Sequence, residues 1–156
     1  MFTGSHKYYA DVILDYIDPE NKYIQHRLYR EHCIPTSDGV FIKDLRIFKN
    51  RDLKDLIIVD NAIYSFGYQL SNGIPIIPFK DDKDDIEFTC LMSYLEKIKD
   101  EPDFRVPNRE AFKMEQVHKF NLGNYINYYV QQDQTDSDEE TKETSDHEES
   151  DTAQVE

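Results

Sequence analysis

The 156-residue sequence lacks tryptophan, has only two cysteines and contains no apolar run long enough to cross a membrane. A membrane-spanning helix needs about 20 consecutive apolar residues, and the first residues contain no apolar core of a signal peptide. Cys33 and Cys90 form no C-x-x-C pair and stand in no Cys/His cluster, so neither a disulfide framework nor a zinc site is indicated. These absences favour a nuclear or cytoplasmic protein with free thiols and no membrane partner.

Basic residues are also scarce, because 18 Lys and Arg stand against 32 Asp and Glu and give a net charge of −14. A chain this acidic is repelled by nucleic acid and by anionic membrane surfaces, so neither is an expected partner. The excess is uneven: residues 133–156 carry a net charge of −10, and the remainder carries −4. From Gln132 onward there is no aromatic residue and almost no apolar one, so we expect a disordered acidic tail over residues 132–156.

The acidic tail allows two roles. Thr135, Ser137 and Ser145 are each followed three residues later by an acidic residue, a pattern that suits acidophilic kinases. Phosphorylation would then add negative charge and create a surface for a partner. The alternative is a charged tail that keeps the protein in solution and has no partner.

Hydrophobic periodicity predicts a helix and then a strand near the N-terminus. After Ser5, which can cap the helix, the apolar residues recur on one helical face until the chain reaches Asp18-Pro19. We expect that face to be buried, and its residues are Tyr9, Val12, Ile13, Tyr16 and Ile17. Residues 23–30 alternate in character, which predicts a strand. A turn at residues 36–39 precedes a short strand over residues 40–42.

A second set of elements follows in the middle of the chain. Residues 56–59 are four consecutive apolar residues with β-branching, which is typical of a parallel strand buried on both faces. Residues 74–78 predict a further strand, and its prolines place it at a sheet edge or a strand end. An amphipathic helix is expected over residues 84–98, and a last helical stretch over about residues 108–121.

Several polar residues stand where a parallel sheet places its ligands. Asp60 and Asn61 follow the strand over residues 56–59, at the carboxyl end where open α/β sheets bind ligands, and their oxygens suit Mg²⁺. Lys43 follows an apolar pair and Arg30 ends a predicted strand, so both are candidate phosphate ligands. Thr3 lies at a strand-to-helix turn that favours anions. The alternatives are an Asp-Asn loop cap, a solvated lysine, a surface ion pair of arginine with Glu31, and a hydroxyl that only caps the helix.

Five short segments occur in order along the first part of the chain: F-T-G-S (2–5), Y-A-D (9–11), L-Y-R-E-H-C (28–33), F-I-K-D-L (41–45) and I-I-V-D-N (57–61). Together they resemble the haloacid-dehalogenase superfamily. More narrowly, they resemble the small phosphatases that act on the C-terminal domain of RNA polymerase II, the NLI-interacting-factor-like phosphatases. The run N-G-I-P-I (72–76) and the helix that follows extend the resemblance over about residues 2–100.

This resemblance implies a fold, an activity and a cofactor. The fold is an α/β domain with a Rossmann-like parallel sheet, of which residues 1–100 form a partial phosphatase domain and residues 101–131 a helical extension. The activity is Mg²⁺-dependent dephosphorylation of phosphoserine or phosphothreonine in a protein substrate. Phosphoryl transfer needs positioning and charge neutralisation more than elaborate covalent chemistry, which agrees with the candidate residues.

The resemblance also assigns roles to individual residues. Thr3 matches the hydroxyl that hydrogen-bonds the transferring phosphoryl group, and Lys43 matches the lysine that offsets negative charge on the nucleophile and the phosphate. Asn61 matches the Mg²⁺ ligand, and Asp60 beside it organises Lys43 and the metal shell. Arg30 matches an arginine near the phosphoryl group. One further aromatic residue matches the lining of the substrate groove, Tyr9.

One departure from the family pattern dominates. The family begins with D-x-D-x-[TV], in which the first Asp forms the aspartyl-phosphate and the second acts as general acid and base. The sequence contains no such motif. We therefore expect a domain truncated at its N-terminus, without its nucleophile and without two strands that lie between the strand of Arg30 and the strand over residues 56–59.

Three accounts of the missing motif remain open. The sequence is a fragment or truncated form of an active phosphatase, or a short product that folds only with a partner. The third account is a non-catalytic interaction module that keeps the haloacid-dehalogenase fold and the acidic tail. Without the missing strands the backbone groups of their neighbours have no partner in a sheet.

Overall fold

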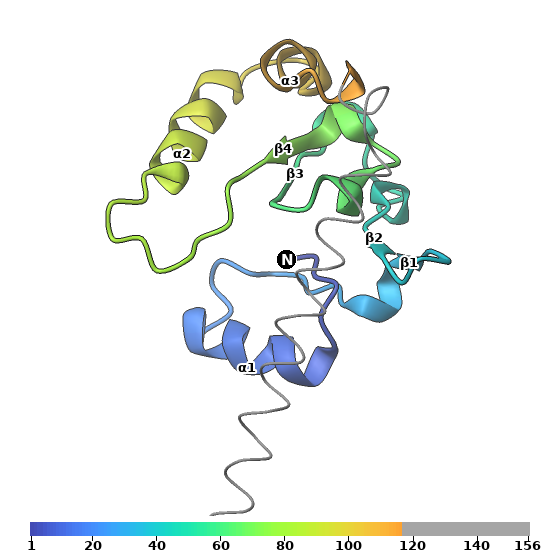
Figure 1. Ribbon diagram of the computed structural model, residues 1–156, viewed down its shortest axis with the longest axis vertical. Helices are drawn as coiled ribbons and strands as arrows, with labels where there is room; N and C mark the ends of the chain where they lie inside the picture. Colours follow the sequence, from blue (N-terminus) through green and yellow to red (C-terminus); the bar gives the residue numbers. More distant parts are fainter. Residues whose placement is uncertain (117–156) are drawn as a thin grey trace, which may run out of the picture. The chain divides into compact units, whose positions relative to one another are not determined.

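The structure is a computed structural model that describes residues 1–116, and Figure 1 shows the order of its elements. These residues all belong to one compact unit. The helices are α1 (Lys7–Ile17), α2 (Glu87–Ile98) and α3 (Arg105–Phe112). The strands are β1 (Ile34–Pro35), β2 (Phe41–Ile42), β3 (Ile58–Asp60) and β4 (Gly73–Pro75). The tail predicted for residues 132–156 and residues 117–131 of the predicted extension over residues 101–131 lie outside the described residues.

The described residues form a mixed α/β structure around small sheets. β3 and β4 pair in parallel, with Val59 opposite Ile74. β1 and β2 pair antiparallel through the turn that the sequence predicts at residues 36–39. A separate parallel bridge joins Phe2 to Leu28. The expected parallel strand after residue 56 and the strand that begins near Ile74 are both confirmed, and Figure 1 shows them side by side.

The prediction of a strand over residues 23–30 is wrong. Only Leu28 takes part in strand pairing there, through its bridge to Phe2. The reason lies in Asp18, which is buried at the end of α1 and accepts hydrogen bonds from the backbone N–H groups of Lys22, Tyr23 and Ile24 at 2.9, 2.9 and 2.7 Å. These three donors are therefore turned toward a carboxylate and are not available to a neighbouring strand.

The prediction of which face of α1 is buried is also wrong. Its five residues are all exposed, whereas Ala10 and Leu14 are buried and pack in a cluster with Tyr29. Ala10 is small, so the helix can approach the segment that carries Tyr29 closely. Among the described residues nothing covers the larger apolar face of α1.

β3 differs from a strand buried on both faces. Ile58 and Asp60 are buried, but the side chain between them, Val59, is 38% exposed. Val59 lines an open groove on the side of β3 that faces the N-terminal segment. Within the described residues, only β4 pairs with β3.

The later helices are close to their predicted positions. α2 begins three residues later than expected and ends at the predicted Ile98, which is buried, although Phe88 and Met92 on its apolar face are exposed. α3 begins three residues earlier than expected, where Asp103 accepts a hydrogen bond from the backbone N–H of Arg105 at 3.0 Å. Among residues 1–116, no helix has the length and apolar character needed to cross a membrane.

Candidate phosphate-binding site

The best-defined feature of the site is a buried ion pair between Lys43 and Asp60. Lys43 directly follows β2, and its backbone N–H donates to the carbonyl of Ser65 at 2.6 Å. Its Nζ donates to Oδ2 of Asp60, the last residue of β3. The two side chains are 13% and 7% exposed, so the interpretation of Lys43 as a solvated lysine is wrong. The other carboxylate oxygen of Asp60 accepts from the N–H of Ala62 at 2.8 Å.

Arg30 lies over the turn that leads into α1. Its Nε donates to the carbonyl of Gly4 at 2.6 Å, and its Nη1 is 2.9 Å from Nε2 of His6. The guanidinium lies 4.7 Å from the centre of the Phe41 ring, which packs against it. No ion pair between Arg30 and Glu31 occurs among the described residues. The contacts with Gly4 and His6 instead hold the guanidinium beside the N-terminal turn.

Thr3 is held in the same turn from both sides. Its backbone N–H donates to the carbonyl of Leu28 at 2.9 Å, and its Oγ1 accepts from the N–H of Ser5 at 3.1 Å. The hydroxyl proton of Thr3 remains able to donate to a ligand. Ser5 does not cap α1, because the helix begins one residue further on, with His6 at its N-cap and without a side-chain capping bond.

Cys33 connects these groups, and sequence reasoning gave it no role. Its Sγ donates to the carbonyl of Thr3 at 3.7 Å, and the thiol is buried. Burial raises the pKa of the Cys33 thiol, and the positive charges of Lys43 and Arg30 oppose that rise. Cys33 therefore contacts Thr3 directly and lies near enough to Arg30, Lys43 and Asp60 for their charges to act on its thiol. The only sequence signal for Cys33 is its position three residues after Arg30, within a segment of the family pattern.

Two predicted site residues do not join this cluster. Asn61 is exposed, and its side chain makes no hydrogen bond within residues 1–116. Tyr9 is 57% exposed on α1 and has no hydrogen bond or ring contact to the other site residues in the described part of the chain. Their roles in metal binding and in lining the substrate groove stay predictions.

The described residues do not by themselves fit a Mg²⁺ site. No group of three or more His, Cys, Asp or Glu that could hold a metal ion occurs among residues 1–116. The carboxylate of Asp60 already accepts hydrogen bonds at both oxygens, from Lys43 and from Ala62. Mg²⁺ is held by one or two carboxylates together with water and substrate phosphate, so a site here needs at least one further carboxylate from outside this set.

Comparison with known proteins decides the family. Residues 1–105 match the family described as NLI interacting factor-like phosphatase. The chain belongs to this family. The family is of the haloacid-dehalogenase type, which agrees with the mixed α/β structure and with the ordered motifs of the sequence.

Three relatives within this family show its range. The chain is 43% identical over 117 residues to CTD small phosphatase-like protein 2 of Dictyostelium discoideum, and the match covers 75% of the chain and 20% of the relative. It is 42% identical over 129 residues to CTD small phosphatase-like protein 3 of Caenorhabditis elegans, covering 83% of the chain and 42% of the relative. It is also 38% identical over 96 residues to the mitochondrial import inner membrane translocase subunit TIM50 of Candida glabrata, and this match covers 62% of the chain and 19% of the relative. The chain therefore spans less than half the length of these relatives.

Proposed function

We propose that this chain carries the phosphate-binding part of a protein phosphatase that acts on phosphoserine or phosphothreonine. The observation that carries the proposal is the buried Lys43–Asp60 pair, which fixes an ammonium group at the carboxyl end of β3. Arg30 and Thr3 belong to the N-terminal turn that Cys33 contacts, and the charges of Lys43 and Arg30 both act on the Cys33 thiol, so in this proposal the two cations and the hydroxyl act on one phosphate group. Such preorganised charges act where negative charge accumulates during phosphoryl transfer.

The nucleophile in this proposal comes from outside the sequence. Formation of an aspartyl-phosphate requires a carboxylate oxygen to bond to phosphorus while the serine or threonine oxygen leaves and takes a proton from a general acid. Water then cleaves the acyl phosphate and releases inorganic phosphate. In this proposal Asp60 is not the nucleophile but the partner of Lys43, with its other oxygen accepting from the Ala62 N–H. We infer that the chain alone binds phosphate without turning it over.

Asn61 is the residue we propose for the metal. Its exposed amide oxygen follows β3 and is free of hydrogen bonds within the described residues, so it can bind Mg²⁺ together with carboxylates supplied from elsewhere. Tyr9 remains our candidate for the substrate groove. A phosphoprotein substrate and a nuclear or cytoplasmic location belong to the same proposal, and a partner for the acidic tail stays a prediction.

A non-catalytic interaction module is the second candidate. Two observations favour it: the sequence lacks D-x-D-x-[TV], and one relative is named as a translocase subunit. In such a module the Lys43–Asp60 pair would serve the fold, since a buried ion pair can be structural. The two functions therefore differ in whether phosphate binds beside Lys43.

Turnover of a generic ester tests the nucleophile part of the proposal. The full chain is incubated with p-nitrophenyl phosphate, with and without Mg²⁺, and release of p-nitrophenol is followed by absorbance. We expect no release above that of a Lys43→Met variant. A matched Lys97→Met variant, which removes an exposed lysine on α2, serves as the control. Mg²⁺-dependent turnover that Lys43→Met abolishes and Lys97→Met retains would show that the chain contains its own nucleophile.

A further inference from the structure

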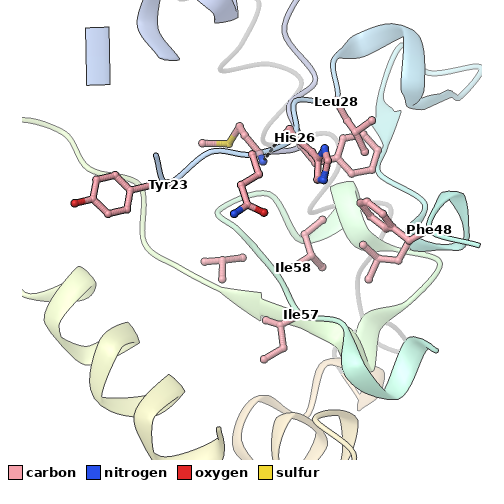
Figure 2. Close-up of a pocket in the computed structure, with 11 residues that line it drawn as sticks. Tyr23, His26, Leu28, Phe48, Ile57 and Ile58 are labelled. Atoms are coloured by element: carbon pink, nitrogen blue, oxygen red, sulfur yellow. Dashed lines mark hydrogen bonds between the residues drawn. The ribbon is translucent and has the colours of Figure 1, made fainter. Parts of the chain in front are cut away.

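Two hollows beside α3, of about 310 and 230 Å³, are lined in part by cations. They differ in this from the groove along β3, where Figure 2 shows mainly apolar side chains, among them Leu28, Phe48 and Ile58. Four residues line both hollows, so the two form one groove, which we call the α3 groove. The shared residues are Leu70, Ser71, Arg109 and Glu115.

Three cations follow one another along the α3 groove. Arg105 and Arg109 lie about one helical turn apart on the same face of α3 and line the larger hollow, and Arg109 and Lys113 line the smaller one. Lys113 directly follows the helix, and its backbone N–H donates to the carbonyl of Arg109 at 3.2 Å. Four residues of helix span about 6 Å, so the cations recur at roughly that distance along the groove.

The cations are available to an anion to different degrees. The side chains of Arg109 and Lys113 are exposed and make no ion pair or side-chain hydrogen bond within residues 1–116. Asp103 holds Arg105 through Nε and Nη2 at 2.9 and 2.8 Å, and Nη1 has no such partner among the same residues. Glu115 is the one carboxylate among the described residues that line the groove, so the lining has a net positive charge.

The smaller hollow also has a donor without an acceptor in its wall. Asn108 lines this hollow and is 2% exposed. Its Oδ1 accepts from the Tyr94 hydroxyl at 2.8 Å, whereas its Nδ2 has no hydrogen-bond partner among the described residues. Buried polar groups are rarely left unpaired, so an occupant of this hollow that brings an acceptor would complete the wall.

The charges of the chain favour a short acidic protein segment over a nucleic acid or a membrane. Residues 1–116 contain 16 Lys and Arg against 21 Asp and Glu. A large anionic partner that spreads over the surface is repelled by this excess. A short segment inside the groove responds mainly to charges within about 8 Å, where the cations of α3 lie.

The spacing of the cations fits an extended segment with an acidic residue at every second position. Such residues lie roughly 6.6 Å apart on one side of an extended chain, close to the step between the cations. The intervening side chains point to the other side, where the groove offers Leu53, Tyr68 and Leu70. Apolar residues suit these positions. The acidic tail of the chain does not match, because Ala153 and Val155 are its only apolar residues.

We propose that the α3 groove binds an extended acidic segment of a partner protein in which carboxylates alternate with apolar residues. Arg109 and Lys113 pair with the carboxylates, and Nη1 of Arg105 extends the row. A carbonyl of the segment supplies the acceptor that Asn108 lacks. Neither Arg30 nor Lys43 lines this groove, so the inference does not rest on the candidate phosphate-binding site.

Fluorescence anisotropy with the full chain tests the inference. The probe is a fluorescein-labelled, amidated peptide of sequence G-D-V-D-L-E-V-D-G. A second probe of the same composition, G-D-D-E-D-V-L-V-G, places its acidic residues consecutively. We expect the alternating probe to bind tighter by roughly threefold or more, because only its carboxylates match the spacing of the cations. Binding of the alternating probe should weaken as the salt concentration rises.

Matched variants localise the binding. Arg109→Gln with Lys113→Gln removes the two exposed cations and is expected to weaken binding by roughly fivefold or more. Lys83→Gln with Lys97→Gln removes the same net charge from exposed positions outside the groove and is expected to bind as the original chain does. Glu115→Gln removes the carboxylate from the lining and is expected to tighten binding by roughly twofold or more.

The inference is overturned if the alternating probe does not bind or binds no tighter than the second probe. It is also overturned if the two double variants bind alike, or if Arg30→Met weakens binding as much as Arg109→Gln with Lys113→Gln, because the probe would then occupy the candidate phosphate-binding site. A peptide of residues 133–156, or a single-stranded DNA oligonucleotide, that displaces the probe as well as the unlabelled probe does would identify a different occupant and overturn it too.

Discussion

Removing the ammonium group of Lys43 is expected to destabilise the protein more than a surface ion pair would. In Lys43→Met the carboxylate of Asp60, 7% exposed, keeps only the N–H of Ala62 as a hydrogen-bond partner. Breaking a buried pair by removing one partner costs about 3–5 kcal/mol, because the remaining charge stays buried without compensation. Exposed pairs contribute only about 0–1 kcal/mol. The burial of both partners places Lys43→Met in the first range.

The reverse substitution is expected to cost less. Asp60→Asn leaves Lys43 with a long stem that can turn its ammonium toward water, and the new amide oxygen can still accept from Ala62. We expect a loss of about 1–3 kcal/mol for Asp60→Asn. The double variant Lys43→Met, Asp60→Asn is expected to lose less stability than the two single variants lose together, since it leaves neither charge without its partner.

Urea unfolding followed by circular dichroism measures these losses. With a slope of about 1–3 kcal/mol per molar urea, Lys43→Met should lower the midpoint by roughly 2 M, whereas Lys97→Met should leave it nearly unchanged. The reasoning would be refuted if Lys43→Met lost less than about 1 kcal/mol, as a surface pair does. It would also be refuted if the three losses were strictly additive, because the two groups would then not interact.

Two further predictions concern the packing of β4 and the acid stability of the fold. A Cβ at Gly73 would lie 2.1 Å from Cε2 of Phe66, whose side chain is fully buried, so Gly73→Ala should lower the free energy of unfolding by about 1–3 kcal/mol in urea titrations. Adding Phe66→Leu should recover part of that loss, and a simple sum of the two losses would contradict the clash. Hydrogen bonds from Lys7 and the Tyr29 hydroxyl lower the pKa of Asp11 to about 2. The Arg105 side chain does the same for the pKa of Asp103, also to about 2. Both values lie below the 3.8 of an unperturbed aspartate, so their contribution to stability is present above about pH 4 and is lost as the pH falls toward 2. As the pH falls across this range, the melting temperature of the double variant Asp11→Asn, Asp103→Asn should fall less steeply than that of the original chain. An unchanged slope would contradict this prediction.

The cluster around Lys43 could be predicted from the sequence only through its ordered motifs. Thr3, Arg30, Lys43 and Asp60 are far apart along the chain, and no local pattern indicates that they meet. What the sequence does show locally is that Asp60 follows an apolar strand and that Lys43 follows an apolar pair. These positions place both side chains at the carboxyl ends of strands, where the structure brings them together.

The failed predictions share a physical cause. Periodicity reports that α1 has an apolar face, but burial depends on which segment packs against it, and Ala10 and Leu14 take that contact instead. The alternation over residues 23–30 predicts a strand, yet Asp18 draws the first backbone donors of that segment to its own carboxylate. The side chain of Asp18 acts over several residues, and strand patterns do not contain that information.

The most direct test of the account is whether the chain distinguishes a phosphorylated peptide from the same peptide without phosphate. Isothermal titration calorimetry with a phosphoserine peptide and its unphosphorylated form measures this at a fixed, near-physiological salt concentration. The account predicts that the phosphorylated form binds at least roughly tenfold more tightly, since a charge-assisted pair with Lys43 or Arg30 contributes about 1.5–3 kcal/mol. The preference should fall in Arg30→Met, checked for folding by circular dichroism, and stay unchanged in Lys97→Met. Equal affinity for the two peptides, or a preference that is the same in Arg30→Met as in the original chain, would contradict the assignment of this site to phosphate.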